Sequence, residues 1–288
     1  MITDRYFAAA NGVQLHAMVA GENGPVMLFL HGFPEFWMAW HRQLPEFARD
    51  HRAVALDLRG YNLSDKPRGV AEYALPKVVD DIRHVLRVLA PDRPAILVGH
   101  DWGGIAGWVL ARESPELLER LIIINAPHPV MFCRELRRSW AQRLASSYAG
   151  FFQLPWIAEC ALTTCDYAAL RKMVFGITAK PENFSDNLRT KYWDAWRKPG
   201  AIAAGLNYYR NLNALKRLLK INEPWQIHVR TLVLWGDQDP ALLRGNLVGL
   251  DEFVPQLTVR RHASATHWIA HEEPAWVNAN IRAFLAGN

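Results

Sequence analysis

The sequence is poor in cysteine and contains no long hydrophobic run. Its three cysteines, Cys133, Cys160 and Cys165, include no CxxC pair. We therefore expect no disulfide framework and a reducing, cytoplasmic environment. No apolar stretch approaches the roughly 18 residues needed to span a membrane. The first residues, MITDRYFAAANG, also lack the apolar centre of a signal peptide. These absences predict a cytoplasmic protein without a membrane partner.

The charged residues give no nucleic-acid signature. They make up 21% of the 288 residues, with a formal net charge of +5. Basic residues cluster in CRELRRSWAQR (133–143) and LKRLLK (215–220). Acidic residues lie near both clusters and neither carries a nucleic-acid-binding motif, so we interpret both as solvated helix faces. Half of the residues are hydrophobic, which suits a globular protein with a substantial core.

Short apolar strands alternate with helical patterns, which predicts an α/β fold with a mostly parallel sheet covered by helices on both sides. Between residues 128 and 228 the strand runs stop and aromatic, helical sequence takes over. We therefore expect core segments at 1–127 and 229–288, with a helical cap at 128–228 inserted between two sheet strands. The expected strands lie at 13–20, 26–32, 51–60, 94–101, 118–127, 229–237 and 256–264, and helices at 78–90, after residue 101 and at 274–287.

The stretch GHDWGG (99–104) joins an expected strand to an expected helix. Hydrolases of one large class carry Gly-x-Ser-x-Gly at such an elbow, with serine as the nucleophile. Here Asp101 stands at the centre, between Gly99 and Gly103. An ordinary tight turn, with the aspartate capping the helix, is the simplest alternative.

An aspartate at the elbow suits attack on a saturated carbon. A serine attacking such a carbon would form an ether, which water does not reopen at useful rates. A carboxylate forms an ester instead, and a base-activated water can cleave that ester. Aspartate is also ionised at neutral pH without any base. We therefore hypothesise that Asp101 forms an alkyl-enzyme ester.

Cleavage of that ester needs a histidine base and an acid that orients it, and the chain offers both in the order nucleophile, acid, histidine. The loop GDQDPALL contains Asp237 and Asp239, and the spacing alone does not choose between them. His267 lies on a late strand-exit loop, whereas His262 lies within an expected strand and His271 at the expected start of the last helix.

The tetrahedral oxyanion needs two backbone N–H donors. The residue after the nucleophile, Trp102, would supply one. Phe33, in the loop HGFPEFW (31–37), would supply the other, because Gly32 allows a sharp approach and Pro34 stiffens the turn. A plain strand-to-loop turn is the alternative for this loop.

Together these segments resemble the α/β-hydrolase-fold epoxide hydrolases over nearly the whole chain. HGFPEFW resembles the family's oxyanion loop, and GHDWGG its aspartate elbow. DLRGYNLSDKP (57–67) is similar to a further family segment, except at Asn62 and Leu63, and INAPHP (124–129) resembles the start of its cap. The resemblance favours Asp239 over Asp237 as the acid. It also supports His267, which is followed by Trp268, although Thr266 replaces a frequent glycine.

Two cap motifs resemble those that hold the family's tyrosines. Tyr148 lies in SYAGFFQLP (147–155) and Tyr209 in LNYYRN (206–211). The resemblance implies that both phenols hydrogen-bond the epoxide oxygen, which becomes an alkoxide and needs a proton donor. Packing of a cap helix is the other interpretation. We further expect Trp37, Phe152, Trp156 and Trp268 to line the substrate pocket.

The sequence thus predicts an epoxide hydrolase that converts a small-molecule epoxide and water to a diol, with no cofactor, metal or nucleic acid. A haloalkane or haloacid dehalogenase could use the same aspartate, but Phe33 stands where a halide-binding asparagine would, and no arginine follows Asp101. A non-catalytic ligand receptor on the same fold is a third option, although it predicts an impaired triad. The sequence does not specify the substrate or the oligomeric state, and a homodimer is compatible with it.

Overall fold

A computed structural model describes residues 2–9, 11–212 and 225–287. Its eight strands form one sheet in the order β1-β2-β4-β3-β5-β6-β7-β8. Strands β3 to β8 run parallel, while β2 pairs antiparallel with both β1 and β4. The strands are β1 (Ile2–Ala8), β2 (Gln14–Ala20), β3 (Val26–Leu30), β4 (Arg52–Leu56), β5 (Ala95–His100), β6 (Leu118–Ile124), β7 (Thr231–Gly236) and β8 (Leu257–His262).

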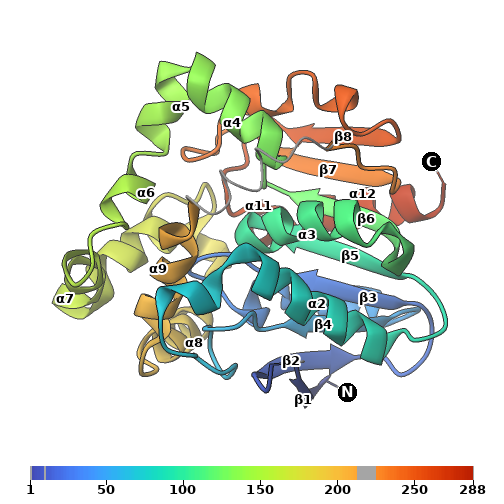
Figure 1. Cartoon of the computed structure of the whole chain (residues 1–288), viewed down its shortest axis with the longest axis horizontal. Coiled ribbons are helices and arrows are strands. Elements are labelled where there is room, and N and C mark those ends of the chain that lie inside the picture. The colour runs from blue at the N-terminus through green and yellow to red at the C-terminus, as the bar shows by residue number, and fades with distance from the viewer. Residues whose placement is uncertain (1, 10, 213–224, 288) are drawn as a thin grey trace.

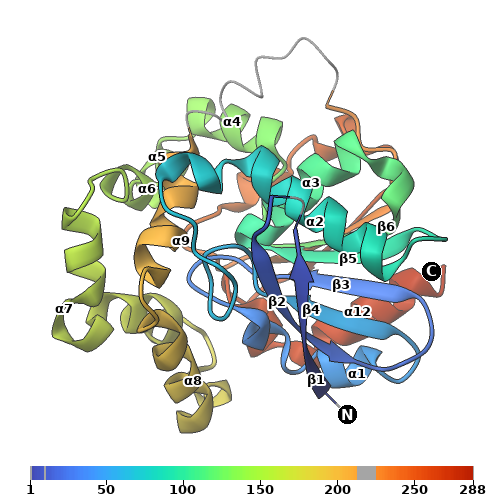
Figure 2. The same cartoon turned by 60° about the horizontal axis from the view of Figure 1, so that its bottom comes forward.

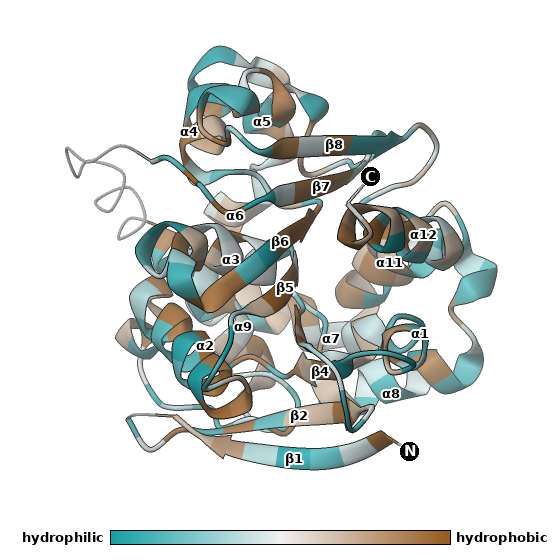
Figure 3. Ribbon diagram, turned by 90° about the vertical axis from the view of Figure 1, so that its right-hand side faces the viewer, coloured by the Kyte–Doolittle hydropathy of each residue, from teal (hydrophilic) through white to brown (hydrophobic). Residues whose placement is uncertain are grey.

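Helices cover both faces of this sheet, as Figure 3 shows. One face carries α2 (Leu75–Leu89) and α3 (Asp101–Glu113), and the other carries α1 (Leu44–Phe47), α11 (Ile269–Glu272) and α12 (Pro274–Leu285). Short 3₁₀ turns occur at Trp37–Trp40, Val70–Tyr73, Pro115–Leu117, Pro181–Asn183, Arg244–Leu247 and Leu250–Glu252. The architecture confirms the predicted α/β fold class.

A group of helices between β6 and β7 lies beside the sheet, on the left in Figures 1 and 2. They are α4 (Pro129–Arg138), α5 (Trp140–Ala145), α6 (Tyr148–Phe151), α7 (Ile157–Arg171), α8 (Asp186–Trp196) and α9 (Ala201–Arg210), with a π turn at Lys172–Gly176 after α7. We call this group the cap. The basic cluster LKRLLK at 215–220 lies outside the described residues.

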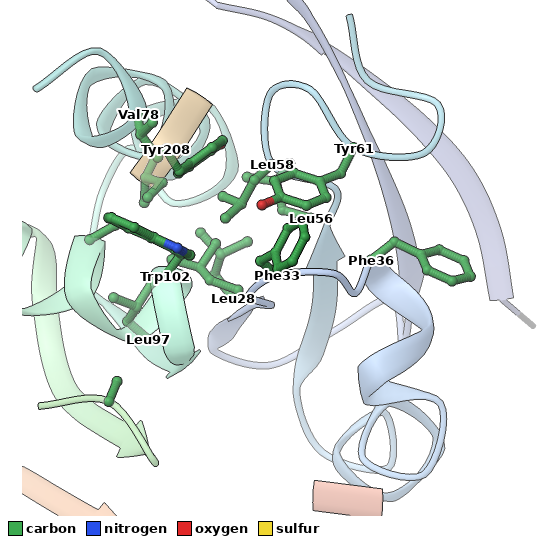
Figure 4. Close-up of a cluster of buried hydrophobic side chains, with 14 of the residues drawn as sticks. Leu28, Phe33, Phe36, Leu56, Leu58, Tyr61, Val78, Leu97, Trp102 and Tyr208 are labelled. Atoms are coloured by element: carbon green, nitrogen blue, oxygen red, sulfur yellow. The ribbon is translucent and has the colours of Figure 1, made fainter. Parts of the chain in front are cut away.

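The central strands are apolar on both sides because both sides are buried. In β3, Leu28 and Leu30 pack toward α2 and α3, while Met27 and Phe29 pack toward α1 and α12. Each fully buried side chain of this kind contributes roughly 1.5–3 kcal/mol. The first cluster continues into the cap through Phe33, Trp102 and Tyr208, which Figure 4 shows above the strands. The core therefore extends without interruption from the sheet to the cap.

Three local expectations differ from the structure. The edge strand β1 was not predicted, because nearly all its residues are exposed and an edge strand then lacks the apolar alternation that marks strands. β4 ends at Leu56, and Asp57 and the residues after it form a loop. His271 lies in the separate short helix α11, and α12 begins at Pro274. Within the described parts of the chain, no helix has the length and apolarity needed to cross a membrane.

Candidate active site

Asp101 lies at the junction of β5 and α3, at the carboxyl end of the sheet. Its φ of +47° is in the left-handed region, which costs an L-residue roughly 1–2 kcal/mol. The turn also requires close backbone approach. A Cβ on Gly32 would lie 2.1 Å from the Asp101 Oδ1, and one on Gly103 would lie 2.4 Å from the Leu30 carbonyl oxygen. The glycines therefore allow the elbow to pack directly against the loop after β3.

The Asp101 carboxylate is buried and points at two of its predicted partners. The Phe33 backbone N–H donates to Oδ1 at 2.8 Å, and Oδ2 lies 3.9 Å from the Nε2 of His267. The Trp102 N–H belongs to the first turn of α3, where helix geometry provides no acceptor for it. Of the two predicted oxyanion donors, the Phe33 N–H contacts the carboxylate, and the Trp102 N–H follows Asp101 directly at the start of α3.

His267 and Asp239 form a buried pair next to Asp101. The Nδ1 of His267 is 2.7 Å from the Asp239 Oδ2. Asp239 also accepts hydrogen bonds from the Asn125 side chain at 2.7 Å and from the backbone N–H groups of Ala241 and Leu242 at 2.8 and 2.9 Å. These donors offset the cost of burying the charge. Its carboxylate can therefore remain ionised beside the imidazole.

Electrostatics favour the charged form of His267 in this state. Burial lowers the pKa of the imidazole, but the charge and hydrogen bond of Asp239, together with the charge of Asp101, raise it to about 9. For Asp239, burial raises the pKa, and the charge and hydrogen bond of His267 hold it below its usual range. Asp237 does not join this pair, since it binds the guanidinium of Arg261 at 2.6 Å.

Tyr148 on α6 and Tyr209 on α9 face the same cavity as Asp101. Their ring centroids lie 6.0 Å apart, and the Tyr209 ring also packs against Phe33, Trp102 and Phe152 at 5.0–5.5 Å. Burial, and next to it the Asp101 charge, raises the pKa of both phenols. Both phenols are therefore protonated and able to donate at neutral pH.

The residues that follow each tyrosine in its motif anchor the cap helices. The Gln153 side chain donates to the backbone carbonyls of Ala149 and Tyr209 at 3.2 and 2.8 Å, which ties α6 to α9. Arg210 forms two hydrogen bonds with the carboxylate of Glu159, at 2.7 and 2.9 Å. These contacts explain why the motifs extend beyond the tyrosines themselves.

The cavity has a volume of about 230 Å³ and is mostly apolar. It is lined by Phe33, Asp101, Tyr148, Tyr209, His267 and Trp268, together with Ala145, Met173, Ile177, Pro240 and Ala241. No group of three or more His, Cys, Asp or Glu side chains in the described ranges is arranged to hold a metal ion. The cavity thus suits an uncharged, largely apolar small molecule.

Three of the four expected pocket residues do not line the cavity. Trp156 is 85% exposed, because it forms the turn before α7 with a φ of +65°. Trp37 begins a 3₁₀ turn outside the cavity lining, where its N–H donates to Asp57. Phe152 is buried and its ring contacts those of Tyr148 and Tyr209, but it is not part of the cavity lining. Trp268 lines the cavity as expected.

Comparison with known proteins identifies the family of this chain. Residues 25–274 match the family model of the alpha/beta hydrolase fold. The chain is 37% identical to human epoxide hydrolase 4, over 96% of this chain and 76% of that protein. It is 40% identical to the AB hydrolase superfamily protein YfhM of Bacillus subtilis, over 97% and 96% of the two chains. The crystal structure of Bacillus megaterium epoxide hydrolase in complex with an inhibitor matches with a TM-score of 0.91 and 38% identity, over 98% and 100% of the chains. This chain belongs to the epoxide hydrolase family of the α/β-hydrolase fold.

Sequence reasoning missed several buried polar residues of this family member. Asn125, within INAPHP, received no role from the sequence, yet it bridges Asp239 and the Gly236 N–H. Glu35, within the oxyanion loop, accepts hydrogen bonds from Tyr192 at 2.7 Å and from His100 and His271 at 3.0 and 2.9 Å. His100 in turn donates to the His267 carbonyl at 3.0 Å. The position of Glu35 inside HGFPEFW was the one available signal.

Proposed function

We propose that the protein hydrolyses an apolar epoxide to a vicinal diol through an ester on Asp101. The observation that carries this proposal is the convergence of one carboxylate, one histidine and two phenols on a single apolar cavity. The family membership and the epoxide hydrolases among its relatives support the reaction class. In this scheme residues 128–228 form the cap domain over the core segments 1–127 and 229–288, and the enzyme works in the cytoplasm.

The first step is ring opening. Tyr148 and Tyr209 donate hydrogen bonds to the epoxide oxygen while Asp101 attacks one ring carbon from the opposite side. The C–O bond of the ring breaks, its electron pair stays on the oxygen, and a phenol supplies the proton. An alkoxide is a poor leaving group without such a donor, which is why two phenols facing a nucleophilic carboxylate favour an epoxide over a haloalkane.

Ester formation changes the charges that act on the other groups. The Asp101 charge raises the pKa of both phenols and of His267 in the free enzyme. Once Asp101 is esterified, that charge is gone, so the phenols become more acidic when the alkoxide needs a proton. The imidazolium also loses its proton more readily, which prepares His267 to act as a base.

The second step is hydrolysis of the ester. Neutral His267, oriented by Asp239, takes a proton from water, and the water oxygen attacks the carbonyl carbon of the Asp101 ester. The N–H groups of Phe33 and Trp102 stabilise the oxyanion before the C–O bond to the diol breaks. The imidazolium gives its proton to the leaving diol oxygen. The Asp101 carboxylic acid that remains returns its proton to the tyrosinate, and one oxygen of the restored carboxylate now derives from water.

A single-turnover reaction tests this proposal. Excess enzyme reacts with styrene oxide in ¹⁸O-water, and mass spectrometry follows both the diol and the peptide that contains Asp101. We expect unlabelled diol in the first turnover and ¹⁸O in that peptide. Labelled first-turnover diol would mean that water attacks the ring directly. Absence of diol, with halide released from a haloalkane instead, would favour the dehalogenase.

A further inference from the structure

Large apolar side chains are exposed along the outer side of the cap. Trp140 and Leu144 on α5 are 73% and 67% exposed, and Trp156 and Ile157 at the start of α7 are 85% and 58% exposed. Phe151 and Leu154 lie between them along the chain. In Figures 1 and 2, α5, α6 and α7 lie to the left and α12 lies to the right. We call these six residues the cap strip.

Helix α5 has its polar and apolar sides reversed relative to an ordinary surface helix. Trp140 and Leu144 are four residues apart and therefore share a face, which is exposed. The buried side carries Gln142 instead, whose amide donates to the Ala241 carbonyl at 2.7 Å and accepts from the Leu243 N–H at 2.9 Å. A helix that buries its glutamine and exposes its tryptophan and leucine is suited to an apolar partner outside the molecule.

The segment that carries the cap strip is mainly basic. Residues 136–158 contain no Asp or Glu but include Arg137, Arg138 and Arg143, with Glu135 directly before this range. None of these arginines pairs with a carboxylate in the part of the chain that the structure describes, and the guanidinium of Arg143 stacks on the Trp140 ring at 5.4 Å. The next acid along the chain, Glu159, is already bound to Arg210. The segment therefore combines exposed tryptophan and aliphatic side chains with several arginines, one of which lies against Trp140.

We propose that the cap strip docks on an anionic lipid bilayer surface. Exposed tryptophan and leucine beside arginine form the side-chain set that enters the headgroup region of such a membrane. A second copy of this chain fits less well, because a twofold interface would bring the arginines of both copies together. The expectation of no membrane partner rested on the absence of a spanning segment, which does not bear on docking at the surface.

Docking through the cap strip would bring the cavity close to the membrane. Helices α5 and α6 also supply Ala145 and Tyr148 to the lining of the cavity. An apolar epoxide concentrates in lipid, so a cap resting on the bilayer would place the cavity beside the substrate's reservoir. Docking itself does not depend on the proposed reaction, since it can be measured without turnover.

Co-sedimentation of the full chain with vesicles tests the proposal. We expect binding to vesicles of phosphatidylcholine with 30% phosphatidylglycerol and at least about tenfold weaker binding to phosphatidylcholine alone, because each interfacial arginine favours anionic lipid. Binding should weaken strongly from 0.1 M to 1 M salt, where the screening length falls from about 10 to about 3 Å. No binding to the anionic vesicles would overturn the proposal.

Two variants locate the surface. Trp140→Ser/Leu144→Ser and Arg137→Gln/Arg138→Gln should each lower the vesicle partition coefficient about tenfold or more, with circular dichroism and turnover of a water-soluble epoxide unchanged. The matched control is Arg87→Gln/Val88→Ser on α2, where Val88 is 55% exposed, and it should bind like the parent. Equal loss in the control would refute the assignment to the strip. A dimer in light scattering that Trp140→Ser/Leu144→Ser converts to monomer, without vesicle binding, would assign the strip to a second copy.

Discussion

Asp239 in the core and Tyr209 in the cap are both buried at the candidate site, but different forces hold them in place. Four hydrogen bonds of 2.7–2.9 Å fix the Asp239 carboxylate, and two of them come from backbone N–H groups of its own loop after β7. The Tyr209 ring is held by contacts with other aromatic rings. Hydrogen bonds fix the orientation of a side chain closely, whereas packing between aromatic rings tolerates small rotations of the side chain.

This difference predicts how the two regions respond to change. A substitution of Asp101, Asp239 or His267 should abolish one chemical step, because no neighbouring side chain is oriented to replace the one that is lost. A substitution in the cap should weaken ring opening by degrees, because two phenols share one task. The following predictions test the contrast between core and cap, beginning with the largest effect.

Asp101→Ala should reduce turnover of epoxides by about 10⁴-fold or more, because the nucleophile is lost. Steady-state kinetics and a melting temperature measure activity and fold together. Asp237→Ala is the matched control, since Asp237 pairs with Arg261 outside the cavity, and it should retain activity near that of the parent. Turnover by Asp101→Ala at even a tenth of the parent rate would exclude the ester mechanism.

His267→Gln should leave ring opening intact and slow ester hydrolysis by about 10³-fold or more, because the base is removed. Mass spectrometry of the protein should show an increase equal to the whole substrate. His262→Gln, at the end of β8, is the control and should show no stable adduct. Continued multiple turnover by His267→Gln would assign the base elsewhere.

Tyr148→Phe and Tyr209→Phe should each slow ester formation by about 10- to 100-fold, and the double variant by about 10³-fold or more, because proton donation is lost in stages. Rapid-mixing fluorescence follows ester formation separately from hydrolysis. Tyr167→Phe on α7 is the cap control. If the double variant opened epoxides at the parent rate, the tyrosines would serve packing only.

The two half-reactions should respond differently to pH. Hydrolysis needs neutral His267, whose pKa of about 9 in the free enzyme falls when Asp101 is esterified. Below that lower pKa, hydrolysis should slow about tenfold per pH unit, while ring opening stays nearly constant because the phenols keep their protons. Single-turnover kinetics between about pH 5.5 and 9 would separate the two steps. A parallel decline of both rates would contradict the assignment.

Asn125→Ala should have the smallest effect, slowing hydrolysis about tenfold while ring opening is unchanged. It removes one of four hydrogen bonds to Asp239, worth roughly 1.5 kcal/mol for a charged acceptor. The ratio of the two single-turnover rates distinguishes this positioning role from general destabilisation, which would slow both. Equal slowing would mean that Asn125 serves only the fold.

Much of the core could be predicted because its candidate site residues lie at strand ends within short motifs. Parallel strands bring their carboxyl ends to one edge, so the loops that contain Phe33, Asp101, Asp239 and His267 had to lie near one another. Their roles remain predictions until the experiments above are made. The edge strand β1 escaped prediction because its exposed residues carry no apolar pattern.

The cap was harder to predict because its residues are placed by packing between segments far apart in the chain. Trp156 and Trp268 look alike as aromatic residues near a motif, yet one is exposed and the other lines the cavity. Asn125 and Glu35 gain their partners only when β6, β7, α8 and α11 come together. No local pattern encodes such contacts.

The sequence by itself determined the elbow, the order of the triad candidates and the alternation of strands and helices, because each depends on spacing within a few residues. Only the tertiary structure decided which aromatic side chains reach the cavity, which buried polar groups surround Asp239 and His267, and that α5 exposes Trp140 while burying Gln142. The physical reason is that burial belongs to a residue's surroundings, and those surroundings are assembled from distant parts of the chain.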